Sequence, residues 1–120
     1  MRFVLWIDDE PSRFNLLHGD WSDVTIIFAR GAKQIDHYLN HSGIKWDLIL
    51  LDHDMGNSIN GMEVCKRFLG ERMFTVACVS NNSPRRQDMV RYLEEWAVPV
   101  HNIPVTDRDF SRKIRMLLEG

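Results

Sequence analysis

The sequence contains few of the residues that are typical of disulfide-stabilised or zinc-binding proteins. It has only two cysteines among 120 residues, Cys65 and Cys78, and no pairing of cysteines and histidines at the spacing that binds zinc. We therefore interpret both thiols as small apolar packing residues of a protein in a reducing compartment.

Long apolar runs and a strong charge of one sign are also missing. The apolar run at the N-terminus covers only residues 3–7, which is too short for a signal peptide. No run approaches the roughly 20 residues that a transmembrane helix needs. The formal net charge of −2 gives no general attraction to nucleic acid or to an anionic membrane surface. We therefore expect a cytoplasmic protein with no membrane partner and no DNA-binding domain.

The overall composition is that of an ordinary globular protein. Hydrophobic residues make up 44% of the chain and charged residues 27%. A chain of 120 residues can bury a sufficient core without covalent staples. No internal repeat, linker or low-complexity segment interrupts it. We expect residues 1–120 to form a single domain.

Strand-like apolar segments alternate with segments of helical spacing. The segments that favour strands are 2–7, 24–28, 47–52, 74–79 and 98–103. The segments that favour helices are 12–18, 32–41, 62–69, 84–96 and 110–118. This alternation predicts an α/β fold, a doubly wound five-stranded parallel sheet with helices on both faces. Pro99 lies early in the fifth segment and predicts a strand at the edge of the sheet.

Acidic residues follow two of the most apolar strands, at the point where each strand ends. The first strand is followed by Asp8 and Asp9, and the third by Asp52, His53 and Asp54. Ligands of parallel α/β sheets bind outside the carboxyl ends of the strands. If the first and third strands are neighbours, the four carboxylates converge at a candidate active site.

Clustered carboxylates repel one another, and a divalent cation relieves that repulsion. Oxygen ligands favour Mg²⁺, Mn²⁺ or Ca²⁺ over zinc, and Mg²⁺ held by one or two carboxylates commonly recruits a phosphate. The alternative is that these residues are solvated turn residues or helix caps. Because the acidic pattern occurs at two strand ends, we predict a site for Mg²⁺ (or Mn²⁺) made by Asp8, Asp9, Asp52 and Asp54.

Three further polar residues are candidates for chemistry at the same edge. An imidazole suits general acid or base chemistry, which makes His53 a candidate for that role, although it could equally be a loop residue that orients a neighbour. Ser80 and Asn82 follow the fourth strand, where they could bind phosphate oxygens. The alternative is that they cap the helix that begins near Pro84.

The order and spacing of these residues resemble the receiver domain of two-component signalling. That domain has an acidic pair after its first strand, here Asp8–Asp9. It has a phosphorylatable Asp after the third strand and a Ser or Thr after the fourth, here Asp52 and Ser80. The resemblance covers essentially the whole chain. It implies the flavodoxin-like strand order 2-1-3-4-5 and a role for Asp52 as nucleophile or metal ligand.

The sequence departs from the receiver pattern after the fifth strand. A receiver has a Lys-Pro pair there, whose lysine contacts the phosphoryl group, whereas this chain has Ile103–Pro104. Isoleucine cannot stabilise phosphoryl charge. Arg85 and Arg86 lie close to the expected site and are candidates to replace the lysine as phosphate clamps. The alternative is that they form the solvated first turn of a helix.

A divergent group, the cyclic-phosphate-processing receiver family, resembles the chain more closely. Its motif after the third strand resembles Leu51–Gly56 followed by Asn60–Gly61. Its motif after the fourth strand resembles Ser80–Pro84 followed by Met89, although the family commonly has a histidine where this chain has Val79. The resemblance implies the processing of cyclic phosphate ends of RNA or nucleotides.

Three hypotheses for the function remain open from the sequence. The first is metal-dependent chemistry on a cyclic or terminal phosphate of RNA or a nucleotide. It would use the catalytic residues Asp52, His53 and Asp54 and the phosphate-binding residues Ser80, Asn82 and Arg85. The second is a phosphorelay receiver that accepts phosphate on Asp52. The third is non-catalytic binding of another protein. Because no output domain is visible, a signal would pass through a separate partner molecule.

Overall fold

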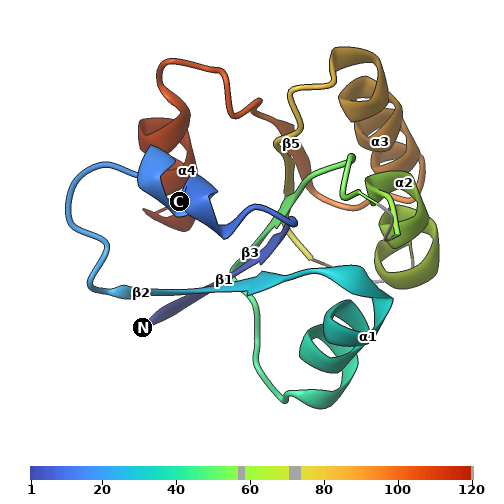
Figure 1. Cartoon of the computed structure of the whole chain (residues 1–120), viewed down its shortest axis with the longest axis horizontal. Helices are drawn as coiled ribbons and strands as arrows, with labels where there is room; N and C mark the ends of the chain where they lie inside the picture. The colour runs from blue at the N-terminus through green and yellow to red at the C-terminus, as the bar shows by residue number, and fades with distance from the viewer. Residues whose placement is uncertain (57–58, 71–73, 120) are drawn as a thin grey trace.

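The apolar segments pair as five parallel strands in the order β2-β1-β3-β4-β5 (Figure 1). The computed structural model describes residues 1–56, 59–70 and 74–119. The strands are β1 (Arg2–Ile7), β2 (Val24–Ala29), β3 (Leu48–Leu51), β4 (Val76–Cys78) and β5 (Val100–Asn102). This order and the parallel pairing confirm the predicted α/β receiver fold.

Side chains of the central strands alternate between two apolar layers. On β1, Leu5 and Ile7 face one cluster of buried residues, and Val4 and Trp6 face the other. All four residues of β3 are buried. A strand that is covered on both faces must be apolar at successive positions, which explains the near-continuous apolar runs. β5 pairs only with β4 and forms an edge, as Pro99 predicted.

The helices divide between the two faces of the sheet (Figure 1). One face is covered by α1 (Gly31–Asp36), α2 (Gly61–Val64) and α3 (Ser83–Glu95). The opposite face is covered by α4 (Phe110–Glu119) and by the short 3₁₀ helix η1 (Pro11–Leu16). Apolar residues at helical spacing attach α4 to the sheet: Phe110, Ile114 and Leu118 are all buried.

Several elements differ from their predicted form. The predicted helix over 12–18 is a 3₁₀ helix without a single buried residue, and Leu17 after it is already extended. Too few apolar side chains face the sheet there to sustain an α-helix. The predicted helices over 32–41 and 62–69 finish in π-helical turns, η2 (His37–His41) and η3 (Cys65–Leu69). Every strand after β2 is shorter at each end than predicted.

Both thiols are free and buried in the core. Burial raises the pKa of Cys65 to about 12 and also raises that of Cys78. Thiols in this state are poor nucleophiles, which agrees with the packing role inferred from the sequence. No helix in the described part of the chain is long and apolar enough to cross a membrane.

Candidate functional site

The ends of β1 and β3 bring three carboxylates together. Ile7 and Leu51 are register partners in the two neighbouring strands, so Asp8 and Asp52 both follow at the same edge of the sheet. One oxygen from each of Asp8, Asp9 and Asp52 lies within 4.8 Å of the other two. Asp8 and Asp52 are buried and Asp9 is half-buried. The predicted convergence of these residues is confirmed.

Burial disfavours the ionised form of two carboxyl groups in this cluster. Burial, followed by the charge of Asp52, raises the pKa of Asp8 to about 6. Burial also raises the pKa of Asp52. Positive charge close to these two carboxyl groups therefore favours their ionised form. Three closely spaced, partly buried carboxylate oxygens are a donor set that fits Mg²⁺ or Mn²⁺.

The sequence interpretation missed a basic side chain that reaches this group. Nη1 of Arg13, on η1, donates a hydrogen bond to Oδ2 of Asp8 at 2.9 Å and lies 3.5 Å from Oδ1 of Asp52. Its side chain is only 16% exposed. No motif marks this arginine, because its position depends on the tight turn between β1 and η1. Its charge opposes the rise in the pKa of both aspartates.

A second polar group lies beside the first and joins β3 to α3. Nδ1 of His53 lies 2.7 Å from Oδ1 of Asp54. Nδ2 of Asn82 donates a hydrogen bond to Oδ2 of the same carboxylate at 3.1 Å. These two contacts hold the pKa of Asp54 below its usual value. Asp54 therefore has its oxygens directed to His53 and Asn82, and its predicted role as a metal ligand stays a prediction.

Asn82 caps the N-terminus of α3, and Ser80 contacts Asn82. The side-chain oxygen of Asn82 accepts a hydrogen bond from the amide of Arg85 at 3.3 Å. The hydroxyl of Ser80, which is fully buried, accepts one from the amide of Asn82 at 3.1 Å. The capping alternative is therefore present in the structure. A hydroxyl that accepts a hydrogen bond still has a proton to donate, so phosphate binding by Ser80 stays a prediction.

The two arginines after Asn82 have different surroundings. Arg86 is fixed between the ends of β4 and β5, since its Nη1 donates to the Ser80 carbonyl at 2.7 Å and its Nε to Oδ1 of Asn102 at 2.6 Å. Arg85 is exposed and lies 3.9 Å from Asp88. Arg85 therefore has a weaker contact than the two hydrogen bonds of Arg86. Its predicted contact with phosphate remains a prediction.

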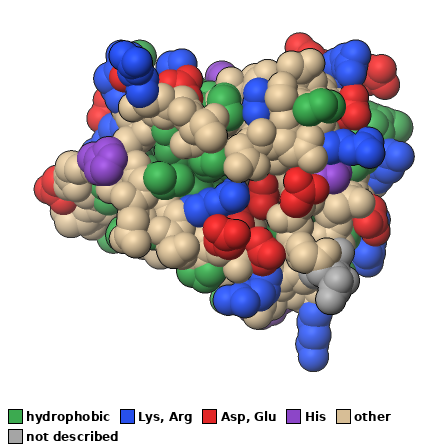
Figure 2. Space-filling model, turned by 45° about the horizontal axis from the view of Figure 1, so that its top comes forward, with side chains coloured by type: hydrophobic (Ala, Val, Ile, Leu, Met, Phe, Trp, Pro, Cys, Tyr) green, Lys and Arg blue, Asp and Glu red, His purple; other side chains and the backbone are tan. Residues whose placement is uncertain are grey.

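The position after β5 carries no charge. Ile103 is 8% exposed and packs in the apolar layer beneath α4 together with Phe110 and Ile114. The side chain therefore belongs to the core, and Arg13 supplies positive charge to the acidic group from the other end of the chain. On the face shown in Figure 2, acidic side chains gather near the centre with basic side chains among them.

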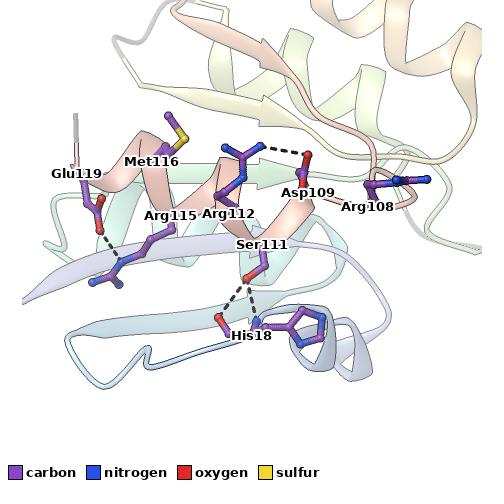
Figure 3. Close-up of a pocket in the computed structure, with 8 residues that line it drawn as sticks. All are labelled: His18, Arg108, Asp109, Ser111, Arg112, Arg115, Met116 and Glu119. Atoms are coloured by element: carbon purple, nitrogen blue, oxygen red, sulfur yellow. Dashed lines mark hydrogen bonds and ion pairs between the residues drawn. The ribbon is translucent and has the colours of Figure 1, made fainter.

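A separate pocket of about 370 Å³ lies on the outer side of α4 (Figure 3). It contains none of the residues predicted for the site. Its charged groups are largely paired with one another, Arg112 with Asp109 at 3.1 Å and Arg115 with Glu119 at 3.0 Å. The acidic edge of the sheet is therefore the better candidate for chemistry.

A family model described as the cyclic-phosphate processing receiver domain matches residues 3–95. The chain belongs to the cyclic-phosphate processing receiver domain family. The matched segment of this receiver domain includes both acidic strand ends and the whole of α3. An acidic group of the Asp8, Asp9 and Asp52 kind is typical of the Mg²⁺ site of receivers. No curated protein matches the sequence.

Solved receiver structures resemble this receiver domain in fold. A CheY-like receiver protein of Methanospirillum hungatei is 17% identical, with a TM-score of 0.70 and coverage of 99% of this chain and 94% of that chain. The response regulator TrrA of Thermotoga maritima, in complex with Mg²⁺ and BeF, is 22% identical, with a TM-score of 0.61 and coverage of 98% and 99%. Rcp1 in its Mn²⁺-bound form is 19% identical, with a TM-score of 0.58 and coverage of 99% and 91%.

Proposed function

We propose that this receiver domain carries out divalent-metal-dependent phosphoryl chemistry on a cyclic or terminal phosphate of RNA or a nucleotide. The observation that supports this most is the group of Asp8, Asp9 and Asp52, whose oxygens lie within 4.8 Å of one another in a chain of the cyclic-phosphate processing family. These three residues would hold Mg²⁺ or Mn²⁺. When bound, the ion would polarise a phosphoryl oxygen and offset its charge.

His53 and Asp54 supply the proton chemistry in this proposal. Asp54 is ionised, since its pKa is lowered, and its Oδ1 accepts a hydrogen bond from Nδ1 of His53. That contact leaves Nε2 as the acceptor for a proton from water. Attack of this water on phosphorus forms one P–O bond and breaks another, and the proton taken up at Nε2 passes to the departing oxygen. Asn82 acts as a positioning residue because it holds Asp54.

Two cyclic substrates test this proposal. Purified protein is incubated with Mg²⁺ or Mn²⁺ and either a 2′,3′-cyclic nucleotide or an oligoribonucleotide that ends in a cyclic phosphate. We expect ring opening that requires the metal and is lost in Asp52→Asn and His53→Gln. Asp109→Asn, which changes a half-buried carboxylate that lies before α4 and pairs with Arg112, should retain it. Absence of turnover on both substrates contradicts the proposal.

A phospho-accepting receiver is the second candidate, and the position of Asp52 favours it. Asp52 is buried at the end of β3 within the acidic group, where a receiver carries its acceptor. The apolar Ile103 counts against it, because it stands directly after β5 in place of the lysine that contacts the phosphoryl group in a receiver. Acetyl phosphate and beryllofluoride distinguish the two candidates. Stoichiometric labelling that is lost in Asp52→Asn, without turnover of cyclic phosphates, would favour the receiver function.

A further inference from the structure

Arg13 occupies the space between two of the three clustered carboxylates. Its Nη1 lies 2.9 Å from Oδ2 of Asp8 and 3.5 Å from Oδ1 of Asp52. Both carboxylates are buried, so these contacts are shielded from solvent and are stronger than ion pairs at the surface. A single guanidinium nitrogen therefore bridges oxygens of the same side chains that would hold a metal ion.

The turn after β1 and the start of η1 position the side chain of Arg13 between Asp8 and Asp52. The amide of Glu10 donates a hydrogen bond to Oδ1 of Asp8 at 2.9 Å, which turns the chain directly after β1. Pro11 starts η1, and the amide of Arg13 donates to the carbonyl of Glu10 at 3.0 Å. Nε of Arg13 also lies 3.7 Å from Oε2 of Glu10. The short helix therefore directs the guanidinium back towards the strand end.

In the part of the chain that the structure describes, no other lysine or arginine pairs with these carboxylates. Within residues 1–56, 59–70 and 74–119, Arg13 is the only lysine or arginine in an ion pair with Asp8 or Asp52. Among the described residues the acidic group thus has one internal cation, and a guanidinium and a divalent ion cannot both lie close to the same carboxylate oxygen.

We propose that Arg13 is an internal counter-ion that a divalent metal must displace from Asp8 and Asp52. This inference rests on the metal site of the proposed function. Without metal, the guanidinium neutralises the buried carboxylates and stabilises the fold. With metal, the same carboxylates turn to the ion and the Arg13 side chain leaves its bridging position. Arg13 therefore lowers the affinity for metal and sets the metal concentration at which the site fills.

Metal titration of charge-changing variants tests the inference. Calorimetry with Mg²⁺ and with Mn²⁺ compares the wild type with Arg13→Gln and Arg13→Lys. We expect Arg13→Gln to bind metal about tenfold or more tightly than the wild type, because a unit charge in direct contact with two ligands has been removed. Arg13→Lys keeps a positive charge and should stay closer to the wild type. Arg30→Gln is the matched control, since Arg30 follows β2 at the same edge of the sheet, and it should change the affinity by less than about twofold.

Thermal unfolding and NMR provide readouts that are independent of calorimetry. In a chelator, Arg13→Gln should melt at a lower temperature than the wild type, and saturating Mg²⁺ should raise its melting temperature by more. In the wild type, the Nε–H signal of Arg13 should shift and exchange faster with water when Mg²⁺ saturates the site. The NMR titration decides the question if Arg13→Gln fails to fold.

The outcomes separate this inference from the proposed function. Metal binding that is equal or weaker in Arg13→Gln overturns the inference and leaves the metal site intact. An Arg13 signal that is unchanged at saturating Mg²⁺ overturns it as well. If neither the wild type nor the variant binds Mg²⁺ or Mn²⁺ at millimolar concentration, the metal-dependent function fails and the inference fails with it.

Discussion

The backbone amide of Gly61 donates a hydrogen bond to the carbonyl oxygen of His53 at 2.9 Å. This bond brings the start of α2 against the end of β3. A Cβ atom on Gly61 would lie 2.8 Å from Cα of His53 and would overlap the carbonyl oxygen of Asp52. The backbone that carries Asp52 and His53 is therefore packed against a residue that must have no side chain.

Gly61→Ala should destabilise the fold and disturb the site. We expect a loss of about 1–3 kcal/mol in the free energy of unfolding, because the methyl group has to push two backbone atoms aside. Denaturant unfolding measures the loss. Gly70→Ala is the control, since a Cβ there meets its nearest atom, Oη of Tyr92, at 3.4 Å. Equal unfolding midpoints for the wild type and Gly61→Ala would contradict the close packing.

Two substitutions of Asn82 separate its capping role from its contact with Asp54. Asn82→Ala removes both interactions and should cost about 1 kcal/mol of stability, the usual cost of losing a helix cap. Asn82→Ser keeps a capping oxygen and should cost only a few tenths of that amount. Both variants remove the amide donor, so the lowered pKa of Asp54 should rise towards its usual value. Carbon-13 NMR of the carboxyl groups checks this rise, and an unchanged pKa would show that His53 alone lowers it.

The raised pKa of Asp8 makes stability depend on pH. Its pKa is 3.8 in an unfolded chain and about 6 in the fold, so the folded state binds the proton more tightly. The resulting stabilisation is fully present below about pH 4 and is lost as the pH rises through about 6. In a chelator, the wild type should therefore lose on the order of 2–3 kcal/mol relative to Asp8→Asn between about pH 4 and pH 7.5. If the stability difference between the wild type and Asp8→Asn does not change with pH over this range, the pKa of Asp8 is not raised in the folded protein.

Removal of two carboxylates should abolish metal binding. We expect saturable binding of Mg²⁺ or Mn²⁺ to the wild type in calorimetry and none to the double variant Asp9→Asn/Asp52→Asn, because one aspartate of the group is too few to hold the ion. Asp109→Asn provides a control for the general loss of negative charge. Retained binding in the double variant would place the metal elsewhere in the protein.

Local patterns predicted the strands and the acidic group well. Apart from Arg2, the central strands β1, β3 and β4 are short runs of consecutive apolar residues, as a sheet covered on both faces requires. Asp8 and Asp52 follow their strands directly, so correct strands place them correctly. Helix type was harder to predict. A helix was predicted over 12–18, whereas the structure has only a 3₁₀ helix over Pro11–Leu16, in which no residue is buried.

Contacts between distant parts of the chain were not predictable in the same way. The hydrogen bond from Asn82 to Asp54 joins residues 28 positions apart. It forms because β4 pairs with β3, which places the start of α3 beside the end of β3. The bridging of Asp8 and Asp52 by Arg13 depends on the turn after β1. Neither contact produces a periodic pattern in the sequence, because each depends on the position of a single side chain in the folded protein.

The sequence by itself determined the parallel sheet, its order through the family resemblance, and the carboxylates at the strand ends. These features follow from apolar runs and from residues adjacent to them in the chain. Only the tertiary structure decided how the site is charged. It placed Arg13 between Asp8 and Asp52, directed Asp54 to His53 and buried Ile103 in the core. Electrostatic contacts fall steeply with distance, so they are set by the three-dimensional positions of side chains and not by their order in the chain.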